Sequence, residues 1–293
     1  GHPGTTLFIL LLLWGAVFLI APLVGSQRVD LADVLRGDPT ASVIFWQLRL
    51  PRVLLALLAG AGLAVSGLSF QTLFRNELAE PYTLGIATGA ALGAVLALRL
   101  EESGVLWGMP LVSLASFAGA ISATALVVGL AWKRRGSTAT LLLAGIAVSL
   151  SCSALILFTQ YLSDSTQTFR MVRWMMGGLS VVGYGEVMWT APWVLGGAAI
   201  LLALRWDLNL LLLGEELAAS RGVDLVRLRL KVLGVASLMI GALVAVAGPI
   251  GFVGLMVPHM IRRWVGHDHL FLSPACLLGG GVFLATCDLA ARP

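Results

Sequence analysis

The chain has 293 residues, of which 58% are hydrophobic and only 12% are charged, and its mean hydropathy is +0.94. Soluble domains carry about 25% charged residues, so this chain has too few charges to cover a surface that faces water, and its solvent must be largely lipid. The formal net charge of +4 reflects membrane topology rather than binding to nucleic acid, because excess Lys and Arg in membrane proteins usually marks the cytoplasmic loops.

Nine apolar stretches approach or exceed the length of a membrane-spanning helix, which needs about 20 apolar residues. In chain order they are 7–24, 53–74, 82–98, 105–132, 138–161, 187–204, 232–247, 250–261 and 271–287. Gly248 and Pro249 separate the seventh stretch from the short eighth one, because this pair favours a turn or a broken helix. The predicted fold class is therefore all-α, a polytopic transmembrane helical bundle with nine spans.

The basic residues predict the orientation of these spans, since Lys and Arg concentrate in cytoplasmic loops. With the N-terminus in the cytoplasm, the cytoplasmic loops hold most of the basic residues, above all the cluster at 133–135 and the loop 205–231. We therefore expect a cytoplasmic N-terminus.

Small residues recur every four positions in the third and fourth stretches, a spacing that lets helix backbones approach closely in lipid. They are Gly85, Gly89 and Gly93 in the third stretch and Ala115, Gly119 and Ala123 in the fourth. We expect these two helices to pack tightly, and the alternative is a direct role of the glycines in substrate binding.

Groups that would energise transport or catalyse a reaction are missing from the sequence. No Asp, Glu, Lys or His lies in the middle of the first seven stretches, and His259 lies near one end of the eighth. A self-energised carrier needs such groups inside the membrane, a membrane enzyme needs convergent catalytic groups, and an ATPase needs a Walker A loop, which this sequence lacks. Active transport would thus draw its energy from another polypeptide. A secondary carrier and a non-transporting scaffold remain the alternatives.

The loop 205–231 carries the pattern of a short amphipathic helix at 215–220. Glu215 and Glu216 suit a helix N-terminus, and Gly222 is placed to end the helix. Such a helix could be a docking site for the energising partner, or it could lie on the membrane surface.

A series of motifs then fits one family. In chain order they are WQLRLPR at 46–52, RNELAEP at 75–81, Leu84-Gly85, LLLAG at 141–145, WMMGG at 174–178, LGEE at 213–216, RGV at 221–223, GFVGLMVPH at 251–259, Arg262, Asp288 and Arg292. In this order the chain resembles the permease subunits of the ABC importers for iron–siderophore complexes, haem and vitamin B12. The stretches 46–52 and 175–178 look most like vitamin B12 permeases.

The resemblance implies a bacterial inner-membrane importer of a metal chelate that works by alternating access. It implies as partners a second permease copy, two ATP-binding subunits, a periplasmic or extracellular substrate-binding protein and the lipid bilayer, with no cofactor, no metal site and no nucleic acid. The chain would be a single transmembrane domain over 1–293, whereas the family has ten helices, the last of them after the segment that ends here. Vitamin B12 and ferric chelates, haem included, both remain candidate substrates.

The resemblance also assigns roles to individual residues. Docking of the binding protein would fall to Arg49, Arg52 and Arg292, because Arg pairs bidentately with carboxylates across an interface; the alternative is that Arg49 and Arg52 anchor a helix end. Coupling to the ATPase would fall to Gly214, Glu215, Glu216, Ala219, Arg221, Gly222 and Val223.

The pore and its gate would be lined by Ser137, Thr138, Ser149, Ser153, Met175 and Met176. The alternatives are serines that bond to their own helix and methionines that fill the core. We expect His259 to be buried with satisfied hydrogen bonds, and His267, Asp268 and His269 to be exposed loop residues rather than a metal site. Glu77 stands where the family commonly has proline, which should affect only a loop.

Overall fold

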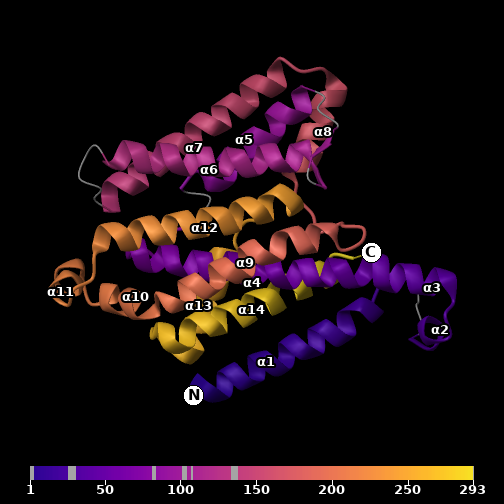
Figure 1. The fold of residues 1–293 in the computed structure, drawn as a ribbon, viewed down its shortest axis with the longest axis horizontal. Coiled ribbons are helices and arrows are strands. Elements are labelled where there is room, and N and C mark those ends of the chain that lie inside the picture. Colours follow the sequence, from indigo (N-terminus) through magenta and orange to yellow (C-terminus); the bar gives the residue numbers. More distant parts are fainter. Residues whose placement is uncertain are drawn as a thin grey trace.

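The computed structural model describes residues 3–25, 31–80, 84–100, 104–106, 108–132 and 138–292, and these residues are almost entirely helical (Figure 1). The elements of the N-terminal half are α1 (Pro3–Ile20), η1 (Ala21–Leu23), α2 (Leu31–Leu35), α3 (Pro39–Val43), η2 (Ile44–Arg49), α4 (Leu50–Phe74), α5 (Ile86–Arg99), β1 (Val105–Leu106), β2 (Met109–Pro110) and α6 (Leu111–Trp132). Those of the C-terminal half are α7 (Thr138–Tyr161), α8 (Ser165–Met175), α9 (Gly185–Ala203), α10 (Arg205–Leu212), α11 (Glu215–Ser220), α12 (Leu225–Ala247), α13 (Val253–Val265) and α14 (His269–Ala290).

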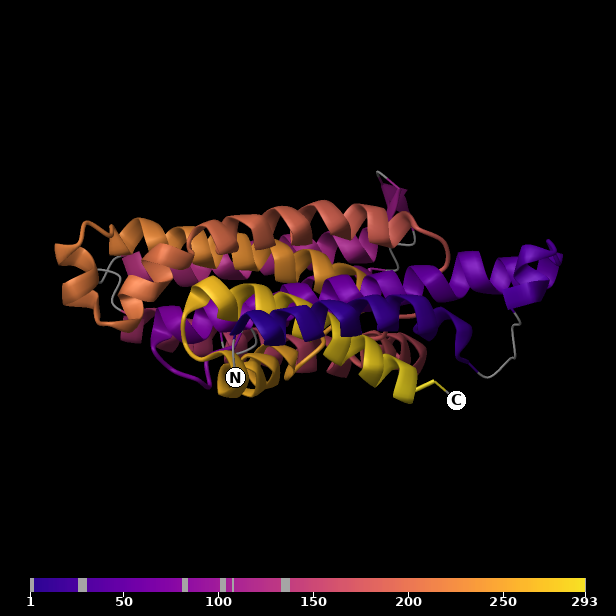
Figure 2. The same cartoon turned by 90° about the horizontal axis from the view of Figure 1, so that it is seen from below.

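The long helices run roughly along one common axis, with α11 at one end of the bundle and α2 and α3 at the other (Figures 1 and 2). Helix α4 lies at the centre, where it packs against α9, α12, α13 and α14, and nearly all of its side chains are buried. Helices α5, α6 and α7 form a layer on one side, whereas α1 packs against α14 on the other. A central helix that is apolar all round is what a membrane bundle requires.

Seven of the described helical segments are long and apolar enough to cross a bilayer. Each of the nine predicted stretches contains a helix, but α5 and α13 have only 14 and 13 residues. At 1.5 Å per residue they are about 21 and 20 Å long, short of the roughly 30 Å hydrocarbon core. The predicted helical bundle is confirmed, and within the described ranges seven of its helices reach the length of a full span, whereas α5 and α13 are shorter. Both short helices begin late because Gly85 and Phe252, with φ of +80° and +69°, precede them in left-handed conformations.

The fourth stretch was also predicted to start too early. Its first residues form a small antiparallel hairpin in which Val105 pairs with Pro110 and Leu106 with Met109, and the helix begins at Leu111. Gly108, with φ of +77°, lies in the turn of this hairpin. Glycine and proline interrupt regular structure even in an apolar run, and hydropathy alone does not register that signal.

The close approach of α5 and α6 is confirmed. A Cβ atom added to Gly93 would collide with the carbonyl oxygen of Ala115, and one added to Gly119 would collide with that of Gly89. Backbone therefore lies against backbone along this contact, as the spacing of small residues predicts. Helix α4 uses the same device, because Gly60 meets the backbone of Gly280 in α14.

Replacing Gly119 with alanine is expected to lower the free energy of unfolding by about 1–3 kcal/mol, the usual cost of overpacking a close contact. Gly129 lies in the same helix with no atom within 4 Å of the position of an added Cβ, so Gly129→Ala is the matched control and should cause no loss. The two thermal unfolding midpoints in detergent test this, and equal midpoints would show that the α5–α6 contact is not tight.

One unbroken helical segment, Pro39–Phe74, contains α3, η2 and α4. Pro51 has no N–H to donate, and the N–H of Leu50 donates to the carbonyl of Phe45, five residues back, which gives the wider π-type turn. The carbonyl of Gln47, four residues before Pro51, accepts instead from the N–H of Gly183 at 2.7 Å. The loop before α9 is thereby attached to this helix.

Candidate functional site

Helix α11 has the bounds that the sequence predicts, Glu215–Ser220. Gly222, with φ of +88°, ends it: the N–H of Gly222 donates to the carbonyl of Ala219, and that of Val223 to the carbonyl of Ala218, both at 3.0 Å. This is the Schellman arrangement, with its usual apolar contact, since Ala218 and Val223 are both buried. Exposed residues of the predicted coupling set are Glu216, Ala219, Arg221 and Gly222.

Glu215 is placed differently from Glu216, because its side chain bonds to its own chain. Its Oε1 accepts from the hydroxyl of Thr138 at 2.8 Å and lies 2.7 Å from Nη2 of Arg229. Burial raises the pKa of Glu215, but the hydrogen bonds from Thr138 and Arg229 and the positive charges of Arg229 and Arg75 outweigh burial, so its pKa lies below the usual value. Glu215 is therefore held as a carboxylate at neutral pH.

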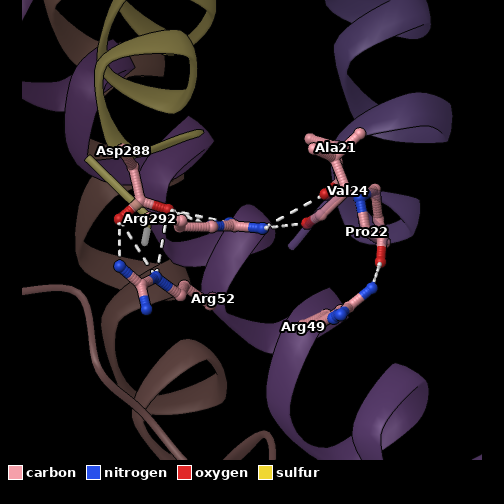
Figure 3. A network of polar contacts seen from close by, with 7 residues as sticks. All are labelled: Ala21, Pro22, Val24, Arg49, Arg52, Asp288 and Arg292. Atoms are coloured by element: carbon pink, nitrogen blue, oxygen red, sulfur yellow. Dashed lines mark hydrogen bonds and ion pairs between the residues drawn. The ribbon is translucent and has the colours of Figure 1, made fainter. Parts of the chain in front are cut away.

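The three arginines of the predicted docking set gather at the opposite end of the bundle from α11, near the ends of α1 and α14 (Figures 1 and 3). Asp288 lies between two of them. Arg52 donates to both carboxylate oxygens of Asp288, and its shortest bond runs from Nη2 to Oδ1 at 2.7 Å. Arg292 donates to Oδ2 of Asp288 from Nε at 3.1 Å and from Nη2 at 2.7 Å. One carboxylate thus holds two guanidinium groups, that of Arg52 through both oxygens and that of Arg292 through Oδ2.

The remaining donors of this cluster hold the end of α1. Nη1 of Arg292 donates to the carbonyls of Ala21 and Val24, and Nη1 of Arg49 donates to those of Pro22 and Leu23. Arg49 is 8% exposed and the side chain of Arg292 9% exposed, whereas that of Arg52 is 30% exposed. Arg52 is therefore the most accessible of the three, whereas Arg49 bonds to the backbone at the end of α1.

The predicted pore residues are divided between two places. Ser153 and Met175 line one cleft of about 390 Å³, between α5, α7 and α8, whose other polar walls are Thr88 and Gln160. The hydroxyl of Thr88 donates to that of Ser149 at 3.2 Å, so Ser149 lies beside this cleft. Thr138 lies at the α11 end, Met176 is 76% exposed, and Ser137 is outside the described residues. Ser153 also donates to the carbonyl of Ser149, as self-bonding serines do.

The comparison with protein-family models decides the identity of the chain, because the FecCD transport family matches residues 9–293. The chain belongs to the FecCD transport family. Its FecCD relatives include the cobalamin import system permease protein BtuC of Halobacterium salinarum, which is 42% identical over 254 residues that cover 86% of this chain and 68% of the relative. Another is the vitamin B12 import system permease protein BtuC of Klebsiella pneumoniae, 40% identical over 292 residues that cover 98% and 85%.

Among solved structures, an inward-facing metal-chelate type ABC transporter superposes with a TM-score of 0.90 at 33% identity, over 99% of this chain and 91% of that one. As a FecCD protein the chain is a multi-pass membrane permease of an ABC import system. The permease performs no covalent chemistry, since ATP is hydrolysed by separate subunits. These systems in general combine a permease dimer with ATPase and substrate-binding partners, in agreement with the resemblance seen in the sequence.

The FecCD chain contains a second polar cluster that the sequence did not reveal, at the α11 end between α4 and α13. Gln71 donates to the carbonyl of Gly254 at 3.3 Å and accepts from Nη2 of Arg262 at 2.9 Å. Nη1 of Arg262 lies 3.0 Å from Oε1 of Glu77 and forms an ion pair with it. The geometry of this contact does not meet that of a hydrogen bond. Glu77 therefore forms an ion pair with a helix as well as occupying a loop. The sequence feature that could have predicted this cluster is Gln71, a single amide side chain in an apolar helix.

Two histidine predictions are wrong. His259 is exposed and lies 3.6 Å from Glu77, since it points outward from the short α13. His269, expected in an exposed loop, is 1% exposed and bonds Thr72 and Ser273, each at 2.9 Å. It is buried because α14 begins at this residue and packs against α4.

Asp268 caps the start of α14. It accepts from the N–H of Leu270 and from the amide of Asn209, and these bonds hold its pKa below the usual range. A carboxylate used in this way is a common helix cap. Within the described ranges no three His, Cys, Asp or Glu side chains are grouped so that they could hold a metal ion.

Proposed function

We propose that the chain imports a metal chelate, with vitamin B12 as the first candidate, as one of two permease copies served by two ATP-binding subunits and a binding protein outside the cytoplasm. The observation that carries the proposal is the separation of two surfaces. Exposed α11 lies at one end of the bundle, and the arginine cluster around Asp288 lies at the other. An importer that is loaded from one side and powered from the other needs this arrangement. The names of the two BtuC relatives support vitamin B12.

The two surfaces also support an orientation. The ATP-binding subunits are cytoplasmic, so the end with α11 would face the cytoplasm. Helix α1 begins toward that same end (Figures 1 and 2), which supports a cytoplasmic N-terminus. In this orientation the loop 205–231 would couple the single domain 1–293 to the ATPase. The residues that would contact the ATPase are Gly214, Glu216, Ala219, Arg221, Gly222 and Val223, whereas Glu215 bonds to Thr138 and Arg229 of its own chain.

Docking of the binding protein would begin at Arg52, because its guanidinium is the most exposed of the three. Among the described residues, Arg52 and Arg292 share the one carboxylate of Asp288, so this pair presents an excess of positive charge to an acidic partner. Arg49 and Arg292 would contribute charge while they hold the end of α1.

The cleft between α5, α7 and α8 is the part of the pathway that would touch substrate. It combines hydroxyl, amide and thioether groups with an apolar wall, and adaptable Met side chains suit a bulky, partly apolar cargo. Ser149, Ser153, Met175 and Met176 would line this passage. Ser137 and Thr138 would form the gate at the α11 end.

The test is ATP hydrolysis by the complete transporter in liposomes, with and without binding protein that carries cobalamin or a ferric chelate. We expect one loaded form to stimulate hydrolysis, and Glu216→Arg to abolish the response because it reverses an exposed charge on α11. A stable complex that no loaded binding protein stimulates would contradict the proposal. Stimulation by a ferric chelate alone would reassign the substrate.

A further inference from the structure

The contacts of Glu215 join three separate segments at one point. Its carboxylate comes from α11, the hydroxyl of Thr138 from the first residue of α7, and the guanidinium of Arg229 from α12. Nη2 of Arg229 also donates to the Thr138 hydroxyl at 2.9 Å. The three groups form a closed triangle, which we term the Glu215–Thr138–Arg229 cluster.

Each member of the triangle is fixed by the other two. The Thr138 hydroxyl donates its single proton to Glu215 and accepts from Arg229, so its two roles are not interchangeable. Arg229 is well buried, with a side chain 12% exposed, and Glu215 is partly buried, with a side chain 38% exposed. Hydrogen bonds to charged groups in such a place are shorter and stronger than those between neutral groups.

Oε1 of Glu215 is occupied within its own chain, and the residue is only partly exposed. The neighbouring Glu216, Ala219 and Arg221 are exposed instead. Helix α11 has only six residues, and these side-chain bonds link it directly to α7 and α12.

We propose that the Glu215–Thr138–Arg229 cluster transmits displacement of α11 to the start of α7, and that Glu215 is a positioning residue for transport rather than a contact for the ATPase. This inference rests on the proposed function, because it concerns how ATP-driven motion reaches the helix that borders the substrate cleft. A buried polar triangle suits this task, because it moves as a unit until it breaks. Breaking it should leave hydrolysis intact and disconnect it from transport.

The discriminating variant is Thr138→Val, which removes the hydroxyl and keeps the shape. In liposomes with the complete transporter, we expect substrate taken up per ATP hydrolysed to fall about tenfold, a normal size for the coupling between two sites. The hydrolysis rate and the assembly of the complex should stay within about twofold of wild type. Thr138→Ser retains the hydroxyl and should restore the ratio.

Arg229 and Arg227 provide a matched pair for the same assay. Both lie in α12, but Arg227 is exposed and pairs with Asp224 at the start of its own helix. Arg229→Gln should lower uptake per ATP as Thr138→Val does, and Arg227→Gln should not. Equal ratios in wild type, Thr138→Val and Arg229→Gln would overturn the inference, as would a parallel loss of uptake and hydrolysis.

A second measurement needs no substrate and separates failure of this inference from failure of the proposed function. Spin labels at exposed Ala139 and Ser220 report the position of α7 relative to α11, with the exposed Cys287 replaced by serine. We expect one narrow distance distribution in the wild-type permease and a broader one in Thr138→Val. An unchanged distribution would show that the cluster does not hold the two helices together, whatever the transporter carries.

Discussion

Replacing Asp288 with alanine is expected to lower the free energy of unfolding by about 3–5 kcal/mol, the usual cost of removing one partner from a buried ion pair. The side chain of Asp288 is 6% exposed and that of Arg292 9%, so the variant leaves Arg292, and with it Arg52, close together without a counter-charge. Thermal unfolding of the purified permease in detergent measures the effect. This is the largest loss that we expect from any single carboxylate.

Two controls make this result specific. Asp33 forms an ion pair with Arg36 in which both side chains are more than half exposed, and Asp33→Ala should change stability by less than about 1 kcal/mol. Adding Arg52→Met to Asp288→Ala should restore part of the loss, because it removes one of the two unpaired charges. A loss from Asp288→Ala no larger than that from Asp33→Ala would show that water solvates the cluster.

Replacing Arg262 with methionine is expected to cost about 3 kcal/mol, since it leaves the buried carbonyl of Gln71 without its donor and Glu77 without its ion pair. Methionine preserves most of the apolar stem, so the loss reports the guanidinium rather than a cavity. The measurement is again the unfolding midpoint, read together with proteolysis at the α11 end, where α13 meets α4.

Arg263→Met is the matched control for Arg262→Met. Arg263 is the next residue of α13, but it is exposed, and its Nη2 lies 3.3 Å from Nε2 of His259. Exposed substitutions of this kind change stability by about 0.5 kcal/mol or less. Similar losses from the two variants would mean that positive charge at the end of α13, rather than the bond to Gln71, stabilises this region.

The parts of the fold that the sequence predicted correctly depend on local signals. Helix α11 was placed to the residue, because Glu215, Glu216 and Gly222 mark its ends without reference to the rest of the chain. The contact between α5 and α6 was also predicted, because the spacing of small residues is a property of each helix alone. Hydropathy identified the nine apolar stretches that contain these helices. It placed the starts of α5, α6 and α13 too early, because Gly85, Gly108 and Phe252 adopt left-handed conformations before them.

The parts that the sequence could not predict depend on residues far apart in the chain. Arg52 and Asp288 are separated by 236 positions, and no local pattern indicates that one neutralises the other. Arg262 and Gln71 are separated by 191. The resemblance led us to expect that Arg49, Arg52 and Arg292 face a binding protein, and it said nothing of their bonds within the chain. For the same reason the burial of His259 and that of His269 were predicted the wrong way round, because burial depends on which neighbouring helix covers each position.

The π-type turn before Pro51 has a consequence for anyone who tries to stabilise this protein. Alanine is the better helix former, so a design procedure that scores each residue by its local preference would choose Pro51→Ala. The new N–H would lie four residues after the Gln47 carbonyl, in competition with the N–H of Gly183 for the same acceptor. The central helix would become more regular while the connection into α9 lost its attachment. Here an irregular turn in one element is what keeps another in place.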